Sequence, residues 1–173
     1  MDLVAEGVDC AIRLGELADS SMIGRRIGAV KMVTCAAPGY LKKMGIPESP
    51  EDLPAHFGVT FQSGVNRRPS PWLFSESGAE KHVLPRGRIS VNEANAYVQC
   101  GVAGFGMIQL PGIMVDAELK NGSLVEVLSE FRPLAKPVTL LYPTRTHVAP
   151  QVNAFADWLV TRFPQLGAEW VEA

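Results

Sequence analysis

The segment that most narrows the possible folds is residues 136–143, KPVTLLYP, whose apolar residues run almost without interruption. Such a run is typical of a strand in a sheet that is covered on both faces. The next segment, residues 149–163, predicts an amphipathic helix, because one helical face collects Val152, Phe155, Ala156, Leu159 and Phe163. A buried strand followed by such a helix indicates an α/β fold with a mainly parallel sheet.

The rest of the chain also alternates between strand-like and helix-like segments. Strands are predicted at residues 8–14, 23–37, 57–62, 72–76, 81–85, 87–92 and 106–111. Helices are predicted at residues 2–6, 38–44, 93–106 and 112–122, with glycines 7, 45 and 122 at three of their ends. Ser49 and Asp52 fit a helix start with a weak capping box, and residues 123–128 lead into an irregular stretch.

Composition excludes several classes of protein. The 173 residues are 47% hydrophobic and 20% charged, which suits one sizeable core or two small lobes. A net charge of −2 supplies no basic field for nucleic acid or acidic membranes. The N-terminal segment lacks the basic region of a secretory signal, and no apolar stretch approaches the roughly 18 residues of a spanning helix. Cys10, Cys35 and Cys100 form no CxxC motif, so we expect a cytoplasmic protein with reduced thiols and no membrane partner.

The sequence carries no recognisable enzyme signature. Neither GxSxG nor a P-loop occurs, and His56, His82 and His147 are too far apart for a metal-ligand spacing. The glycine-rich stretch at 101–106 leaves a predicted helix and enters a strand, whereas a dinucleotide loop runs from strand to helix. We interpret its glycines as allowing a sharp reversal and close helix–strand packing. We therefore expect no catalytic residue, no metal and no cofactor.

Several strand ends and helix starts are suited to holding a small polar ligand. Arg13 and Gly15 end the first predicted strand, residues 35–40 lead from a strand into a helix, and residues 91–95 repeat that arrangement. Ligands of open α/β sheets bind beyond the carboxyl ends of strands, and helix N-termini favour anions. A structural alternative to ligand binding stays open for two of these residues. Arg13 would form a salt bridge to a nearby acid, and Asn92 would only cap the helix that follows it.

Five segments, taken in order, carry a family resemblance: DLVAEGVDCAIRLGELADSSMIGRRIG, APGYLKKMGIPESPEDLPAH, GRISVNEANAYVQCGVAGFGMIQLP, NGSLVEVL and YPTRTHVAPQVNAFADWLVTRF. Together they resemble the effector-binding domain of LysR-type transcriptional regulators over residues 2 to about 165. The resemblance implies a type 2 periplasmic-binding-protein-like fold, with two α/β lobes, a hinge and an effector cleft between the lobes.

The resemblance also implies boundaries and a site. Lobe I would comprise residues 1–33 and 134–173, and lobe II residues 34–133, with crossover strands near 33–35 and 137–140. The effector site implied by the resemblance consists of Arg13, Gly15, Ala36, Ala37, Pro38, Val91, Asn92, Glu93, Ala94, Val138 and Thr139. Arg13, at the mouth of this cleft, and the helix starts favour a carboxylate or another small anion as effector.

A regulator of this family carries a DNA-binding winged helix and a linker helix before the segments matched here. We expect these, and the first strand–helix–strand of lobe I, to be absent from this chain, so that DNA is contacted only through the absent domain. The predicted function is effector sensing and dimerisation, in a homodimer or a higher homo-oligomer. The alternative is a stand-alone solute-binding protein of a transport system, which would need a signal peptide.

Overall fold

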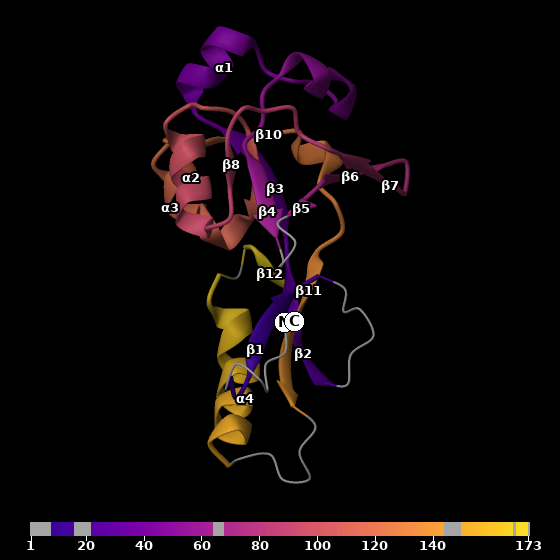
Figure 1. Ribbon diagram of the computed structural model, residues 1–173, viewed down its shortest axis with the longest axis vertical. Coiled ribbons are helices and arrows are strands. Elements are labelled where there is room, and N and C mark those ends of the chain that lie inside the picture. The colour runs from indigo at the N-terminus through magenta and orange to yellow at the C-terminus, as the bar shows by residue number, and fades with distance from the viewer. Residues whose placement is uncertain (1–7, 16–21, 64–67, 144–149, 168, 173) are drawn as a thin grey trace. The chain divides into compact units, whose positions relative to one another are not determined.

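A computed structural model describes residues 8–15, 22–63, 68–143, 150–167 and 169–172. The chain divides into two compact units (Figure 1). Unit 1 comprises Met1–Lys31 with Ala135–Ala173, and unit 2 comprises Met32–Leu134. The predicted lobes, 1–33 with 134–173 and 34–133, have similar boundaries. Their role as the two walls of an effector cleft stays a prediction.

Unit 1 is built on one antiparallel sheet whose described strands lie in the order β1-β11-β2-β12. The strands are β1 (Ala11–Leu14), β2 (Met22–Val30), β11 (Lys136–Pro143) and β12 (Val171–Glu172). Helix α4 (Pro150–Arg162) runs alongside this sheet (Figure 1) and continues into the 3-10 turn η4 (Phe163–Gln165). Val152, Ala156 and Leu159 of α4 are buried as predicted, whereas Phe155 is exposed and stacks on Trp158.

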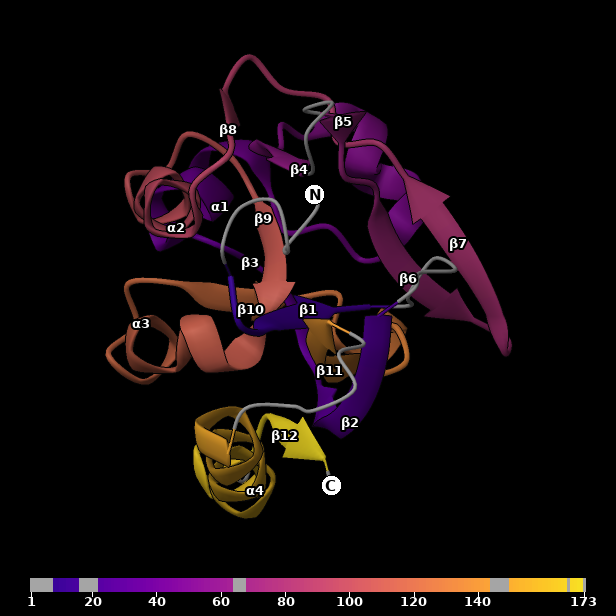
Figure 2. The same ribbon diagram turned by 60° about the horizontal axis from the view of Figure 1, so that its bottom comes forward.

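The described residues of unit 2 form three small sheets. They are ordered β10-β3-β9, β5-β4-β8 and β6-β7, and the β6–β7 hairpin projects from the unit (Figure 2). The strands are β3 (Met32–Ala36), β4 (Thr60–Ser63), β5 (Arg68–Pro69), β6 (Trp72–Glu76), β7 (Ala79–Val83), β8 (Ser90–Val91), β9 (Ile108–Pro111) and β10 (Val125–Val127). The helices are α1 (Pro38–Met44), η1 (Pro50–Ala55), α2 (Ala94–Val102), η2 (Gly112–Met114), α3 (Asp116–Lys120) and η3 (Ser129–Phe131).

The prediction of a mainly parallel sheet is wrong. Among the described strands, the paired ladders are antiparallel except for β4 with β8. The cause lies in the path of the chain. It passes into unit 2 after β2 and returns to unit 1 through β11, so these two long strands run in opposite directions. No helix in the described part of the chain is long and apolar enough to span a membrane.

Local signals identified most helix boundaries correctly. Helix α1 begins at Pro38 and ends before Gly45, whose φ of 87° suits a residue without a side chain. At the start of η1, the Asp52 carboxylate accepts the backbone N–H of Ser49 at 2.9 Å, as the capping box predicts. The predicted helix at 112–122 is instead η2 followed by α3, and the strand-like segment at 23–37 breaks at Lys31 into β2 and β3.

Three further segments differ from their predicted extents. The first strand is shorter than 8–14, a strand (β10) forms within 123–128, and the helix predicted at 93–106 is confined to α2. The helix predicted at 2–6 lies outside the described residues.

The glycines at 101–106 act as predicted, by allowing close packing. A Cβ atom on Gly101 of α2 would lie 2.5 Å from Cδ1 of Ile108 in β9. A Cβ atom on Gly106 would lie 2.8 Å from the carbonyl oxygen of Phe57. Both distances are shorter than real Cβ contacts, so a side chain at Gly101 would push α2 away from β9, and one at Gly106 would clash with the backbone at Phe57.

A buried hydrogen-bond network joins β3, β6, β9 and α2 inside unit 2. The Gln109 amide donates to the Thr34 hydroxyl at 3.0 Å and to the Leu73 carbonyl at 2.9 Å, and accepts the Leu73 N–H at 2.8 Å. The Tyr97 hydroxyl accepts the backbone N–H of Gln109 at 3.1 Å and the Trp72 indole N–H at 3.3 Å. Burial raises the pKa of Tyr97 to about 12, so this hydroxyl keeps its proton at neutral pH.

Candidate functional site

The part of the predicted site that lies in unit 1 forms at the end of β1. Arg13 of β1 is paired with Thr139 of β11, and Leu14 is paired with Val138. The next residue, Gly15, has a φ of 93° and donates its N–H to the carbonyl of Pro137 at 2.8 Å. The sheet therefore makes Arg13, Gly15, Val138 and Thr139 neighbours, and their contact with an effector stays a prediction.

Arg26 joins this group, although the sequence did not single it out. On the other side of β11, Thr139 is paired with Arg26 of β2. Residues directly opposite one another in a sheet point to the same face, so Arg13, Thr139 and Arg26 share one face of three neighbouring strands. Arg25 comes directly before Arg26 in the same strand, and its guanidinium binds the Asp157 carboxylate of α4 at 2.7 Å.

The signal that would have found Arg26 is the alternation of side chains along a strand. The pair Arg25-Arg26 is suited to a solvated loop, but within β2 its two side chains point to opposite faces. The ladder between β11 and β2 is irregular between Val138 and Thr139. Such an irregularity turns side chains locally, and it falls at the two β11 residues predicted to contact effector.

Arg13 is half-buried and is not without a partner in the structure. The structural salt bridge considered for this residue therefore stays open beside its predicted contact with effector.

In unit 2, the predicted site residues Ala36, Ala37 and Pro38 lie where β3 meets α1. Ala36 and Ala37 are buried, and Pro38 occupies the first helical position. The first turn of α1 contains no acidic residue, and its last turn contains Lys42 and Lys43.

An open pocket of about 680 Å³ lies next to this junction. It is lined by Ala37, Pro38, Gly39, Tyr40, Lys43, Met44, Phe57, Val102, Ala103, Gly104, Phe105 and Ser123. The Lys43 side chain gives it a positive charge that the site prediction did not include.

The segment Val91–Ala94 corrects one expectation. The N-cap of α2 is Glu93 rather than Asn92: its carboxylate accepts the N–H groups of Asn95 at 2.9 Å and Ala96 at 2.7 Å. These hydrogen bonds lower the pKa of Glu93, so the carboxylate is charged at neutral pH. A charged carboxylate already occupies the start of α2, so this helix N-terminus is poorly suited to a second anion. Val91 lies in β8, Asn92 is exposed, and Ala94 is the first residue of α2.

The described residues show neither a metal centre nor an exposed reactive thiol in these regions. In the described ranges, no three His, Cys, Asp or Glu side chains lie where they could hold a metal ion. Cys35 of β3 is fully buried, and burial, with smaller effects of Glu126 and Glu118, raises its pKa to about 12. A thiol that keeps its proton is a poor nucleophile, so Cys35 serves as a core residue.

Comparison with known proteins settles the family. The model of the LysR substrate binding domain matches residues 1–164. The chain belongs to the LysR substrate-binding domain family. This membership agrees with the expected type 2 periplasmic-binding-protein-like fold, and regulators of this family bind small-molecule effectors and form oligomers.

Two curated relatives and one solved structure illustrate the match. The chain is 35% identical to the HTH-type transcriptional regulator YhjC of Escherichia coli over 92% of its own length and 53% of the relative's. It is 33% identical to the HTH-type transcriptional activator AaeR of the same species, over 96% of its length and 53% of the relative's. The structure of CrgA, a LysR-type transcriptional regulator from Neisseria meningitidis, gives a TM-score of 0.78 at 25% identity, with 96% of this chain and 55% of CrgA covered. The chain thus spans about half the length of the curated relatives it matches.

Proposed function

We propose that this LysR-family domain senses a small anionic effector, a carboxylate or a similar anion, in the cytoplasm. The observation that carries the proposal is the placement of Arg13 and Arg26 on either side of Thr139, on one face of three paired strands. Two guanidinium groups on one face attract an anion, and each presents paired N–H donors that match the two oxygens of a carboxylate. Thr139 lies between the two arginines in the ladder, and its hydroxyl would be a further donor.

The effector would contact residues of the predicted site. In unit 1 these are Arg13, Gly15, Val138 and Thr139, which the ladder between β1 and β11 places beside one another. An effector that bound one arrangement of the units more tightly than another would shift the population towards it, by no more than its differential affinity. In a full-length regulator, that shift would change the contacts with DNA made by a DNA-binding domain outside the residues described here.

Self-association is part of the same proposal, and β1 supports it. Within the described part of unit 1, β1 is one of the two outer strands of the sheet, and its Ile12 and Leu14 side chains are exposed. An outer strand with exposed apolar residues favours pairing with another chain. We therefore propose a homodimer or a higher homo-oligomer.

Thermal unfolding of the purified chain with simple anions tests the effector class. The panel is acetate, succinate, citrate and sulfate, with succinamide as a neutral counterpart. At least one anion should raise Tm, because a ligand at about 100 times its Kd stabilises the folded state by about 2.7 kcal/mol. Arg13→Gln and Arg26→Gln should each remove most of that rise.

Arg25→Gln is the matched control, because Arg25 lies in the same strand but binds Asp157 on the opposite face. Each ligand-induced shift is taken relative to the Tm of the same variant without ligand. An anion-specific rise that survives both Arg13→Gln and Arg26→Gln would refute the proposed site.

A further inference from the structure

A second, more enclosed pocket lies within unit 2, and none of the predicted effector-site residues lines it. Its volume is about 260 Å³. The lining residues are Leu53, Pro54, His56, Phe57, Gly58, Trp72, Val83, Leu84, Pro85 and Arg86. They come from η1, from the two strands of the β6–β7 hairpin and from the segments beside them.

His56 is buried and lines this pocket, and one of its ring nitrogens has no hydrogen-bond partner among the described residues. The side chain is 6% exposed, and Nδ1 lies 3.2 Å from the Tyr40 hydroxyl. Within the described residues, Nε2 has no hydrogen-bond partner, while every fully buried polar side-chain atom has one. Nε2 is therefore not sealed inside the core. Because His56 lines the pocket, we conclude that Nε2 faces it.

The hydrogen bonds around Tyr40 allow Nε2 to be a donor without leaving a buried group unpaired. The Tyr40 hydroxyl accepts the Phe57 N–H at 2.8 Å and has one proton to give, to the Phe57 carbonyl at 3.1 Å or to Nδ1 of His56. If the proton goes to Nδ1, the Phe57 carbonyl still accepts the Met107 N–H at 2.9 Å. In that arrangement Nε2 carries the hydrogen and donates into the pocket.

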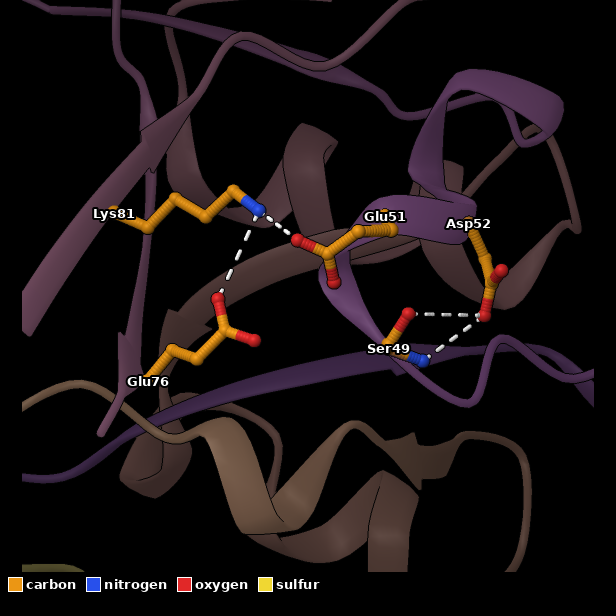
Figure 3. Close-up of polar contacts among 5 residues, drawn as sticks. All are labelled: Ser49, Glu51, Asp52, Glu76 and Lys81. Atoms are coloured by element: carbon orange, nitrogen blue, oxygen red, sulfur yellow. Dashed lines mark hydrogen bonds and ion pairs between the residues drawn. The ribbon is translucent and has the colours of Figure 1, made fainter.

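Arg86 supplies a positive charge at the pocket. Its guanidinium carbon lies 5.9 Å from the centre of the Phe57 ring, and among the described residues it has no carboxylate partner. The acids on the neighbouring elements are engaged elsewhere. Lys81 contacts Glu51 and, at 3.9 Å, Glu76 (Figure 3).

Asp52, the other acid of η1, lies close enough to His56 for the two side chains to interact electrostatically. Its carboxylate also accepts the N–H groups of Glu48 and Ser49, both at 2.9 Å. The positive charge of Arg86 is thus left for a ligand.

The remaining wall is apolar and rigidly shaped. Trp72 is buried, Val83 is half-buried, and Leu84 is exposed at the rim. A Cβ atom on Gly58 would lie 2.6 Å from both Trp72 and Pro85, so the backbone closes tightly here. Apolar walls with a few convergent polar groups are typical of small-molecule sites, and this volume suits a ligand smaller than an ordinary drug molecule.

We propose that this pocket binds a small monocarboxylate with an apolar body, whose carboxylate lies between Nε2 of His56 and the Arg86 guanidinium. The apolar body would pack on Trp72 and Leu84. The site is separate from the effector site proposed above, because none of the residues of that site lines the pocket. It would give the domain a second ligand, so that two metabolites could act on one regulator.

Isothermal titration calorimetry of the full chain with cyclohexanecarboxylate tests the proposal. This probe combines one carboxylate with a compact apolar ring, and cyclohexanecarboxamide is its neutral counterpart. Arg86→Gln should weaken binding of the acid at least about tenfold. Leu84→Asp, at an exposed rim position, should weaken it similarly by repelling the carboxylate. Arg88→Gln is the matched control, because Arg88 is an exposed cation of the same segment that does not line the pocket, and it should bind as the wild type does.

Arg13→Gln separates this site from the effector site. Affinity lost in Arg86→Gln and Leu84→Asp but kept in Arg13→Gln and Arg88→Gln would support the pocket. Affinity lost only in Arg13→Gln would overturn the pocket and leave the effector site standing. Absence of binding, equal binding of the amide, or equal affinity of wild type and Arg86→Gln would also overturn it.

Discussion

The two units differ in how they use polar side chains in their interiors. Unit 2 buries Thr34, His56, Thr60 and Gln109, whereas Thr139 is the buried polar residue of unit 1 among those described. In unit 2 the amide of Gln109 bonds to two other strands at once. In unit 1 the central strand β11 is held by backbone ladders on both sides and by buried Val138, Leu140 and Leu141.

This difference indicates at which buried positions a substitution lowers the stability of the fold most. A buried amide with three partners cannot be replaced by an apolar residue of similar shape without leaving those partners unpaired. Apolar positions in a ladder tolerate exchanges of similar volume, because the backbone makes the directional bonds. Unit 2 should therefore respond more strongly to loss of a single polar group.

The largest expected effect comes from Gln109→Leu. This change leaves the Leu73 N–H, the Leu73 carbonyl and the Thr34 hydroxyl buried without their hydrogen-bond partner. We expect a loss of about 3 kcal/mol in the free energy of unfolding, since each stranded buried group costs about 1–3 kcal/mol and some of them relax. Urea denaturation followed by circular dichroism measures it.

Two controls decide whether this loss reflects the network. Gln99→Leu changes an exposed glutamine of α2, and should cost less than about 0.5 kcal/mol. Thr139→Val is the counterpart in unit 1, and should cost less than about 1 kcal/mol. Equal losses for Gln109→Leu and Thr139→Val would remove the contrast between the units.

The next effect concerns alkaline pH and the buried Cys35 of unit 2. Its pKa rises from an ordinary 9.0 to about 12 on folding, mainly because burial disfavours the thiolate. Between these values the unfolded chain loses the proton while the folded chain keeps it. The contribution of this group to the free energy of unfolding is therefore fully present below pH 9. It falls as the pH rises above 9, by about 2.5 kcal/mol at pH 11.

Urea titrations of wild type and Cys35→Ala at pH 8, 9, 10 and 11 isolate that contribution. Cys35→Ala will have its own stability at pH 8, so the quantity compared is the change with pH. The variant should lose clearly less stability than the wild type between pH 9 and pH 11. Identical slopes for the two proteins would show that Cys35 ionises as readily in the folded chain as in the unfolded one.

The smallest expected change in stability comes from replacing a glycine by alanine, which measures how closely other atoms pack around that glycine. Gly101→Ala should cost about 1–2 kcal/mol, because the new methyl group meets the fully buried Ile108. Gly39→Ala in α1 has open space around its Cβ position and should stabilise the chain by about 0.5–1 kcal/mol. Thermal unfolding should show a lower Tm than the wild type for Gly101→Ala and a higher Tm for Gly39→Ala.

Gly28 is the counterpart of Gly101 in unit 1. Its Cβ atom would lie 2.7 Å from the carbonyl oxygen of Glu172. Gly28 also has a φ of 153°, which residues with a side chain rarely adopt, so Gly28→Ala combines backbone strain with crowding and should cost more than Gly101→Ala.

Features encoded over a few neighbouring residues were predictable. Helix α1, its end at Gly45 and the bond from Ser49 to Asp52 each depend on positions within one or two turns. The direction of strand pairing was not predictable in this way. It depends on how the chain passes between the units, which no local pattern records.

The candidate site shows the same limit. The grouping of Arg13 with Val138 and Thr139 followed from the family resemblance, and the ladder between β1 and β11 brings them together. Arg26 was missed because only the register of β2 against β11 places it beside Thr139. Asn92 was considered as the cap of α2 because asparagine favours that position, whereas the longer Glu93 side chain reaches back to the amides. The pocket at His56 and Arg86 draws on residues 53–86, with no short motif to mark it.

The division of the chain has a consequence for its synthesis. Unit 2 is one continuous stretch, Met32–Leu134, whereas unit 1 needs Met1–Lys31 together with Ala135–Ala173. On the ribosome, unit 2 has all its residues while β1 and β2 still await their partner β11. Strand β2 ends at Val30 and β11 ends at Pro143, so at about 5–20 residues per second the early strands wait roughly 6–23 s for that partner. During that interval Ile27, Ala29 and Val30 of β2, which the finished unit buries, lack their cover, and a chaperone would protect them.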